Sequence, residues 1–397
     1  MQPTVQMSQR NHEMHVLDIR PTDASRQLAD QISRGLDAPF NKKTLPTVIL
    51  YDEVGLLLYD KFSAEAPEYY HFGAELEILK GHADEIVRKM HKHTGNTTVP
   101  GEAVIELGAG SLRKTVHFLR ALSDIVPTSS PVPPVTFYAL DLDGNELRRA
   151  LSEVHNSDIG PSLSGKVETR GLWGTYENGF EFIKAGRLGS SRKVNGSSLS
   201  QANSGADITS TTSLGQPPTH FLFLGGSIGN FYRGDDSQLL RSLPLQPGDT
   251  LLLGLTHTIE QDDDPAHTYK DTNGYCQAFT MNGLNAAGNI LGSPGLFDQN
   301  NWEFTNIHSE EKCRFEGFYK CLRSHEIYIG AYNQTVQFLE GELLQISVSA
   351  NYSESDTYRL FNDGQLRPIQ RWVDSSHRHS LWLLERSTTA VEHNPSA

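Results

Sequence analysis

Apolar side chains recur with two different periods along this chain, and the change falls near residue 100. From residue 16 to 95 the spacing is mostly helical, and it is clearest over residues 74–90 (AELEILKGHADEIVRKM). Turn-forming residues interrupt it at residues 44–55 and at Pro67. The first part of the chain is therefore expected to form several helices separated by short breaks.

Between residues 100 and 260, short apolar runs alternate with helical stretches. This alternation predicts a parallel β-sheet with helices on both faces. The predicted strands are AVIELGAG (103–110), VTFYALDLD (135–143), KVETRGLWG (166–174), THFLFLGGSIGN (219–230) and DTLLLGLT (249–256). Near the C-terminus, residues 368–374 and 379–386 predict an antiparallel hairpin that closes the sheet.

Residues 260–345 interrupt the sheet pattern and are too long for a loop. They contain a helical stretch (269–291) and then alternating runs. We expect them to pack with the first helices over the strand ends, where open α/β sheets bind ligands. The sequence thus predicts an α+β domain made of residues 16–80 and 260–347, and a sheet domain made of residues 81–259 and 348–388.

Two segments lack the apolar residues that a packed structure needs. Residues 1–15 are expected to be a flexible tail. Residues 187–218 are rich in Ser, Gly, Thr and Asn, and are expected to be a disordered insertion.

Composition narrows the class of protein. The 397 residues carry a net charge of −14, which disfavours a nucleic-acid or membrane-surface partner. There is no apolar run of transmembrane length, and the N-terminus lacks an apolar signal region. Three cysteines at irregular spacing suggest neither disulfides nor a metal site. A cytoplasmic protein is expected, and a monomer is compatible with these features.

The turn after the first predicted strand contains candidate cofactor chemistry. Glu106, Gly108 and Gly110 form an ELGAG turn between a strand and a helix, and Asp141 ends the next strand, where an acid can hold ribose hydroxyls. A dinucleotide fingerprint would have a third glycine where this chain has Arg113. An acid at Glu106 suits a cationic sulfonium better than a pyrophosphate, so S-adenosylmethionine is the expected cofactor.

Several motifs together resemble one family. The segments LYDEVG, APEYYHFGAELEIL, VIELGAGSLRKT, LGGSIGNF and PGDTLLLGL are similar to the histidine Nα-methyltransferases of ergothioneine biosynthesis, whose relatives include fungal enzymes acting on tryptophan or prenylated tryptophan. The resemblance runs from about residue 15 to 388, apart from the 187–218 insertion. It implies a class I methyltransferase (Rossmann-like) sheet with a second, substrate-binding α+β domain, and methyl transfer from S-adenosylmethionine to an α-amino nitrogen.

The resemblance also implies which residues hold the cofactor. Gly108 and Lys114 match positions that contact S-adenosylmethionine, and Asp141 matches the ribose acid. Thr175 and Tyr176 fall where the family usually has Asp-Phe beside the adenine, so Thr175 is a departure with fewer acceptor atoms.

Four further residues match the family's substrate site. Tyr69 matches an amino-acid contact, and Asn230 and Tyr269 match the residues that hold the amino and carboxylate groups. Tyr51 matches a tyrosine near the amine. It, or a water beside it, is the candidate catalytic acceptor for the proton that the amine must lose.

The choice of amino acid depends on a second departure. In an ungapped alignment, Ser347 stands where the histidine enzymes have the Glu that holds the imidazole, Ser349 stands at their Ser, and Gly317 replaces a methionine. Both changes remove bulk and one removes charge, which favours the larger indole of L-tryptophan. A modified tryptophan and histidine remain alternatives, because a one-residue slip would put Gln345 or Ile346 at the key position. A non-catalytic S-adenosylmethionine-binding protein is a further alternative, because Thr175 departs from the family pattern.

Overall fold

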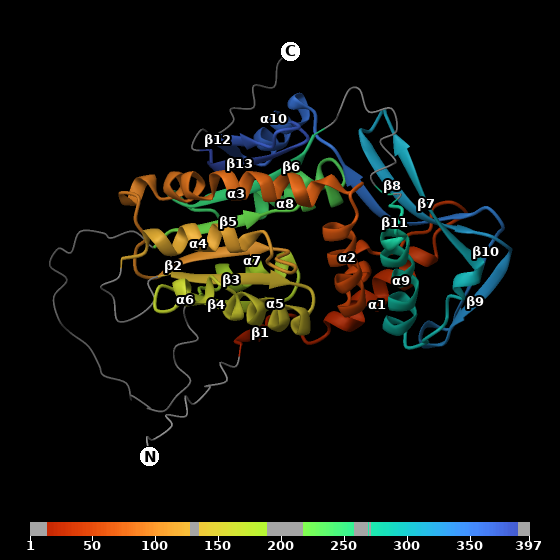
Figure 1. Ribbon diagram of the computed structural model, residues 1–397. Helices are drawn as coiled ribbons and strands as arrows, with labels where there is room; N and C mark the ends of the chain where they lie inside the picture. Colours follow the sequence, from red (N-terminus) through yellow and green to blue (C-terminus); the bar gives the residue numbers. More distant parts are fainter. Residues whose placement is uncertain (1–13, 128–134, 189–216, 258–268, 270, 388–397) are drawn as a thin grey trace, which may run out of the picture.

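The computed structural model describes residues 14–127, 135–188, 217–257, 269 and 271–387. Two groups of elements lie side by side, an eight-stranded sheet with its helices and a smaller α+β group (Figure 1). Nearly all of the predicted tail (1–15) and the predicted insertion (187–218) lie outside the described residues.

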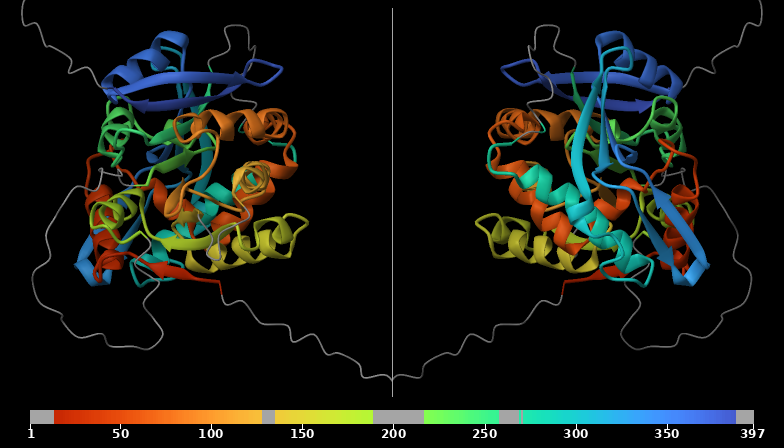
Figure 2. Two further views of the ribbon diagram at one scale, coloured as in Figure 1. Left: turned by 90° about the vertical axis from the view of Figure 1, so that its left-hand side faces the viewer. Right: turned by 90° about the vertical axis from the view of Figure 1, so that its right-hand side faces the viewer.

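The large sheet has the order β1-β4-β3-β2-β5-β6-β13-β12. Its first six strands in that order pair in parallel, and the last two form the antiparallel hairpin predicted at the C-terminus. The strands are β1 (Val16–Asp18), β2 (Glu102–Leu107), β3 (Val135–Asp141), β4 (Val167–Trp173), β5 (Thr219–Phe223), β6 (Thr250–Thr256), β12 (Leu366–Val373) and β13 (His379–Arg386). In both views of Figure 2 the red β1 lies at one edge and the dark-blue hairpin at the other.

Alternate residues of the buried strands supply two separate apolar cores, because successive side chains point to opposite faces. One face packs against α3 (Tyr70–Met90), α4 (Thr115–Ile125), α5 (Gly144–Asn156) and α6 (Gly160–Leu163). The other packs against α7 (Tyr176–Lys184), α8 (Asp235–Ser242) and α10 (Glu354–Asp363). Together with the closing hairpin, this is the predicted class I methyltransferase fold.

The smaller group has a third apolar core. Its helices are α1 (Ala24–Leu36), the 3-10 turn η1 (Thr47–Tyr51), α2 (Glu53–Glu65) and α9 (Tyr275–Ile290), and its strands are β7 (Trp302–Ser309), β8 (Arg314–Cys321), β9 (His325–Ile329), β10 (Gln334–Phe338) and β11 (Leu343–Ala350). The antiparallel order β11-β8-β7 forms one sheet, and β9 and β10 form a hairpin. The end of β11 reaches the large sheet group, where the backbone oxygen of Ala350 lies 2.7 Å from a Cβ position built on Gly229.

Two elements differ from the sequence-based expectations. The helical interpretation of residues 16–95 is wrong at its start, because Val16–Asp18 forms a strand that pairs with β4. Strand β7 was not expected at all. The expected boundary at residue 80 falls inside α3, whose Ile78 and Leu79 already pack on the large sheet. None of the described helices combines the length and apolar character needed to cross a bilayer.

Candidate active site

A cleft with three arms opens where the carboxyl ends of the parallel strands face the smaller group. The aromatic arm is lined by Tyr69, Tyr269 and Phe304, among others, the lysine arm by Glu106 and Lys114, and the aspartate arm by Asp141 and Tyr176. The space between the lining atoms, including the part open to solvent, is about 800 Å³ in the aromatic arm and about 1150 Å³ in the aspartate arm. Tyr59 and Ser227 line all three arms and mark their junction.

The aspartate arm is built on the turn after β2. Gly108 has φ +69°, and a Cβ there would lie 2.9 Å from the hydroxyl of Tyr176, so glycine satisfies both the backbone and the space. The backbone N–H of Gly110 donates to Asp141 Oδ2 at 2.7 Å, and that of Leu142 donates to Oδ1, also at 2.7 Å. These bonds fix the carboxylate at the end of β3, where it lines the arm.

Thr175 and Tyr176 have different local roles. Thr175 is the N-cap of α7, because its hydroxyl accepts from the backbone N–H of Asn178 at 3.3 Å, and the Asn178 side chain accepts from Thr175 N–H in return. Tyr176 presents its ring to the arm against Phe223 and Phe231. Both predicted residues therefore line the arm, with the threonine hydroxyl engaged in capping the helix.

The lysine arm contains a buried carboxyl group with one free oxygen. Glu106 Oε1 accepts from the Thr115 hydroxyl at 2.8 Å, whereas Oε2 has no hydrogen-bond partner within the described residues. Burial raises the pKa of Glu106 to about 8, so its neutral form is favoured at pH 7. The site thus offers an acid that a bound cation would ionise.

A second buried carboxylate, Glu75, organises this arm from α3. It accepts a short hydrogen bond from Lys114 Nζ, bonds from Gly225 N–H at 2.8 and 2.9 Å, and one from His379 Nε2 at 3.1 Å. Burial alone would raise the pKa of Glu75, but the Lys114 ammonium and the His379 contact lower it to about 2. The carboxylate therefore stays ionised and fixes both Lys114 and the turn after β5.

Tyr51 and Asn230 meet where the aromatic and aspartate arms join. Asn230 Nδ2 donates to the Tyr51 hydroxyl oxygen at 3.3 Å, and both residues line both arms. Burial, together with the neighbouring phenols Tyr59 and Tyr176, raises the pKa of Tyr51 well above its usual range. Tyr51 is therefore a neutral phenol at physiological pH.

The deep end of the aromatic arm is the inner face of the sheet β11-β8-β7. Gly317 pairs across β8 with Ser347 on one side and with Asn306 on the other. A Cβ at Gly317 would lie 2.4 Å from Ser347 Oγ and 3.4 Å from the Phe304 ring. A bulge between Gln345 and Ser347 keeps Ser347 and Ser349 on this face.

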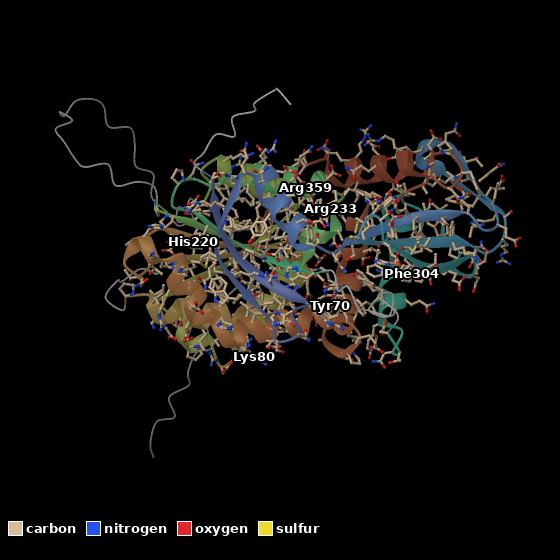
Figure 3. The ribbon with its side chains drawn as sticks, turned by 90° about the horizontal axis from the view of Figure 1, so that it is seen from above. Tyr70, Lys80, His220, Arg233, Phe304 and Arg359 are labelled. Atoms are coloured by element: carbon tan, nitrogen blue, oxygen red, sulfur yellow. The ribbon has the colours of Figure 1, made fainter. Side chains whose placement is uncertain are left out.

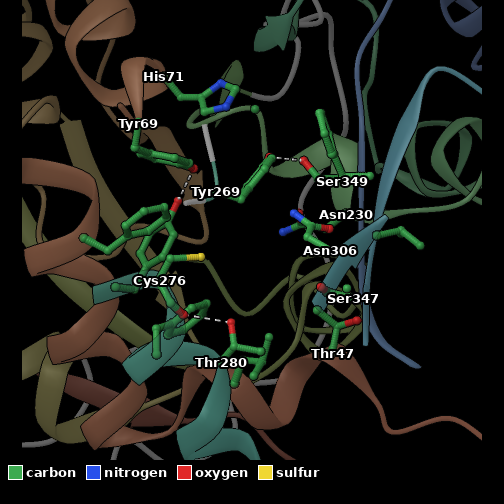
Figure 4. A pocket seen from close by; sticks show the side chains of 18 of the residues that line it. Thr47, Tyr69, His71, Asn230, Tyr269, Cys276, Thr280, Asn306, Ser347 and Ser349 are labelled. Carbon is green, nitrogen blue, oxygen red and sulfur yellow. Dashed lines mark hydrogen bonds between the residues drawn. The ribbon is translucent and has the colours of Figure 1, made fainter. Parts of the chain in front are cut away.

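Other side chains complete the aromatic arm (Figure 4). The hydroxyls of Tyr269 and Ser349 lie 2.6 Å apart, and those of Tyr59 and Tyr69 lie 3.1 Å apart. His71 hydrogen-bonds Thr256 through Nδ1 at 2.9 Å, and burial lowers its pKa to about 3. The described lining includes no Asp, Glu, Lys or Arg, so the arm is uncharged at neutral pH.

Every residue predicted for the site from the sequence lines one of the three arms. The individual roles given to them stay predictions. Sequence reasoning missed Glu75, Tyr59, Asn306 and Phe304. The family motif APEYYHFGAELEIL contains Glu75, but its place on a helix gave no sign that it is fully buried.

A histidine–carboxylate cluster lies away from the cleft. His91 Nε2 is 2.7 Å from Glu102 Oε1, and His91 Nδ1 is 2.7 Å from the Val87 carbonyl oxygen, so both ring nitrogens face acceptors. Each ring nitrogen of His91 is thus already in contact with a protein oxygen. His220 beside it lies at the opposite end of the molecule from Phe304 of the aromatic arm (Figure 3).

Comparison with known proteins identifies the family. Residues 28–386 match the family described as histidine-specific, S-adenosylmethionine-dependent methyltransferases. The chain is 33% identical over 390 residues to the L-tryptophan methyltransferase of Psilocybe serbica, covering 95% of this chain and 99% of that one. It is 28% identical over 404 residues to ergothioneine biosynthesis protein 1 of Neurospora crassa, covering 98% of this chain and 38% of that protein.

A more distant relative is the 4-dimethylallyltryptophan N-methyltransferase of Claviceps fusiformis, which is 23% identical over 392 residues and covers 94% of this chain and 96% of that one. The family expected from the sequence motifs is thus confirmed across nearly the whole chain. With its closing hairpin, glycine turn and three-armed cleft, the protein belongs to the S-adenosylmethionine-dependent, histidine-specific methyltransferase family.

Proposed function

We propose that this protein transfers methyl groups from S-adenosylmethionine to the α-amino nitrogen of L-tryptophan. The observation that carries the choice of substrate is an uncharged, aromatic-lined arm whose deep end is formed by two small residues, Gly317 and Ser347, that share one volume. An imidazole needs polar partners for both ring nitrogens, whereas an indole mainly needs apolar surface. The similarity to the Psilocybe serbica enzyme supports the same substrate.

The residues of the other two arms fit the cofactor. Asp141 lines the aspartate arm as a ribose-binding carboxylate, and Tyr176 offers an aromatic face to the adenine. Lys114 and the unpartnered Glu106 Oε2 offer complementary partners for the carboxylate and amino groups of the methionine part. When bound, S-adenosylmethionine supplies an already activated methyl group.

The chain's contribution to the reaction is then mainly positional. Tyr269 and Ser349 offer hydroxyls in the aromatic arm, and Asn230 offers an amide for the amino-acid carboxylate or amine. Tyr51 stands at the junction as a neutral phenol, so it orients the amine by accepting a hydrogen bond and does not act as a phenolate. The amine's proton leaves to water, either directly or through the Tyr51 hydroxyl, which then passes its own proton on to water in the same step.

The decisive experiment is a substrate panel read by mass spectrometry. The protein is incubated with S-adenosylmethionine and with tryptophan, 4-dimethylallyltryptophan or histidine, separately and in equal mixture. We expect methylated tryptophan to dominate, with the added methyl located on the α-nitrogen by fragmentation. The Asn230→Ala variant removes the amide at the junction of the aromatic and aspartate arms and should form little product.

Two outcomes would contradict the proposal. Methylation of histidine alone would reverse the choice of substrate. If S-adenosylmethionine raised the thermal stability of the protein while no amino acid of the panel was methylated, cofactor binding without this catalysis would be the better description.

A further inference from the structure

Strand β7 contributes a polar group to the aromatic arm that the family motifs do not include. We infer that the side-chain oxygen of Asn306 accepts a hydrogen bond from the indole N–H of the substrate and so selects for that ring. The inference rests on the proposed function and deepens it. It assigns a specificity-determining contact to a residue outside the motifs that identify the family.

The position of Asn306 follows from strand pairing. Asn306, Gly317 and Ser347 are direct partners across β7, β8 and β11, and all three line the aromatic arm. Neighbouring strands lie about 4.8 Å apart, so the backbones that carry Asn306 and Ser347 lie about 10 Å apart on either side of Gly317. A flat bicyclic ring laid over Gly317 would have a polar side chain at each edge.

The side chains around Gly317 suit an aromatic ring. The Phe304 ring lies 3.4 Å from the Cβ position of Gly317, and the Phe315 ring centroid is 5.1 Å from that of Tyr269. In Figure 4, Asn306 and Ser347 lie along the same wall, across the cavity from Cys276. Burial raises the pKa of the Cys276 thiol to about 12, so this opposite wall is uncharged as well.

A buried indole N–H needs an acceptor, because leaving it unpaired costs about 1–3 kcal/mol. Two nearby hydroxyls already make hydrogen bonds, since Thr47 Oγ1 donates to the Ile346 carbonyl at 2.8 Å and Ser349 is paired with Tyr269. The side chains of Asn306 and Ser347 have no hydrogen-bond partner among the described residues. The Asn306 side chain is the longer of these two, and the Ser347 hydroxyl leans over Gly317, so the Asn306 amide oxygen is the acceptor that we assign to the ring.

The test replaces the N–H of the substrate without changing its shape. Wild-type protein is compared on tryptophan and on β-(benzothiophen-3-yl)alanine, in which sulfur takes the place of N–H, by steady-state kcat/KM. We expect tryptophan to be favoured about tenfold or more. In Asn306→Leu, kcat/KM for tryptophan should fall by that factor through KM, while the value for the sulfur analogue stays within about twofold.

Two further variants keep the test sharp. Asn306→Asp retains the acceptor oxygen and should restore the preference for tryptophan. Thr305 lies on the same strand with its side chain on the other face, so Thr305→Val should leave kcat/KM unchanged for both substrates.

The inference would be overturned if Asn306→Leu lowered kcat/KM for tryptophan and for the sulfur analogue equally. It would also be overturned if Ser347→Ala, and not Asn306→Leu, removed the preference for tryptophan over the sulfur analogue. Both results leave tryptophan methylation standing. Failure of the wild type to methylate either compound would instead reject the proposed function.

Discussion

Gly317 and Ser347 are direct partners across β8 and β11, and the Ser347 hydroxyl lies 2.4 Å from where a side chain at residue 317 would begin. The two residues thus share one volume at the end of the aromatic arm. A larger side chain at either position reduces the space for the substrate ring. The alignment with the histidine enzymes pointed to each residue separately, and the pairing of β8 with β11 places the two side by side.

Filling this volume should remove activity toward tryptophan. In Gly317→Met the thioether would occupy the shared volume and push the Ser347 hydroxyl aside, so we expect kcat/KM for tryptophan to fall about 100-fold, the scale of a few kcal/mol of lost ring burial. Steady-state kinetics with tryptophan measure this. Gly330→Ala is the matched control, because the nearest atom to its Cβ position is 3.9 Å away and the residue lies outside the cleft. Unchanged kinetics in Gly317→Met would show that the ring does not lie over residue 317.

The paired change should alter which amino acid is accepted. Gly317→Met with Ser347→Glu supplies bulk together with an anion that can hold an imidazole. We expect the ratio of histidine to tryptophan methylation to rise at least about tenfold relative to Gly317→Met alone, one charge-assisted hydrogen bond being worth about 1.5–3 kcal/mol. Competition assays with both amino acids in one mixture measure the ratio. A ratio that does not rise would mean that residue 347 does not face the ring.

Tyr51 gives a prediction about pH. Because burial raises the pKa of Tyr51, the phenol stays neutral over the working range and cannot itself cause a rate change by titrating. Tyr51→Phe removes the hydroxyl that accepts from Asn230, and we expect kcat to fall about 10-fold to 100-fold near pH 7, with a smaller defect as rising pH deprotonates the free amine. Profiles of kcat against pH for both proteins test this. The remote, exposed Tyr328→Phe should match wild type, and equal rates for Tyr51→Phe and wild type at every pH would remove Tyr51 from the mechanism.

Glu106 predicts proton release on cofactor binding. Its pKa is raised from 4.5 to about 8, so it carries a proton at pH 7 in the free protein. A cation bound at Oε2 lowers that pKa, and binding should release about one proton at pH 7 and fewer as pH rises past 8. The affinity for the cofactor should accordingly rise as the pH increases from 7 toward 8.

Calorimetry in buffers of different ionisation enthalpy measures the release. If S-adenosylmethionine and S-adenosylhomocysteine released the same number of protons, the amino group would be the partner of Glu106. If only S-adenosylmethionine released a proton, the sulfonium would be the partner. Glu106→Gln should release no proton at this site. A proton count for Glu106→Gln equal to that of wild type would contradict the prediction.

The Glu75–Lys114 pair predicts a loss of stability. Glu75→Ala leaves a buried ammonium without its partner and frees the Gly225 turn, so the free energy of unfolding should fall by about 3–5 kcal/mol. Denaturant titration measures the change. In the exposed pair of Arg120 with Asp158, Arg120→Ala should cost less than about 1 kcal/mol. Similar losses in the two variants would mean that Glu75 does not anchor the site.

The parallel strands and the cofactor turn could be predicted because their signals are local. Strand β2 is an unbroken buried run directly followed by the glycine turn, and Asp141 is the last residue of strand β3. Strand β1 has only three residues, too few to show a period. In strand β7 polar side chains such as Thr305 and Asn306 fall on both faces, so its apolar alternation is broken and the sequence gives no strand signal there.

The site residues that the sequence did not reveal depend on contacts between distant segments. Glu75 occupies a polar position of a helix and is nevertheless fully buried, because its partners come from residues 114, 225 and 379. Asn306 enters the site only through the register of three strands. The ionisation of Glu106 likewise depends on burial that no local pattern reveals.

The cleft divides the chemistry between separate pieces of chain. Loops after β2, β3 and β5 line the lysine and aspartate arms, whereas one face of β7, β8 and β11 lines the aromatic arm, and the two sides meet around Tyr59 and Ser227. Substitutions in one row of an antiparallel sheet can therefore retune which amino acid is alkylated without disturbing how the alkyl donor is held. Such modularity offers a physical reason why a single scaffold can acquire new acceptors through very few mutations.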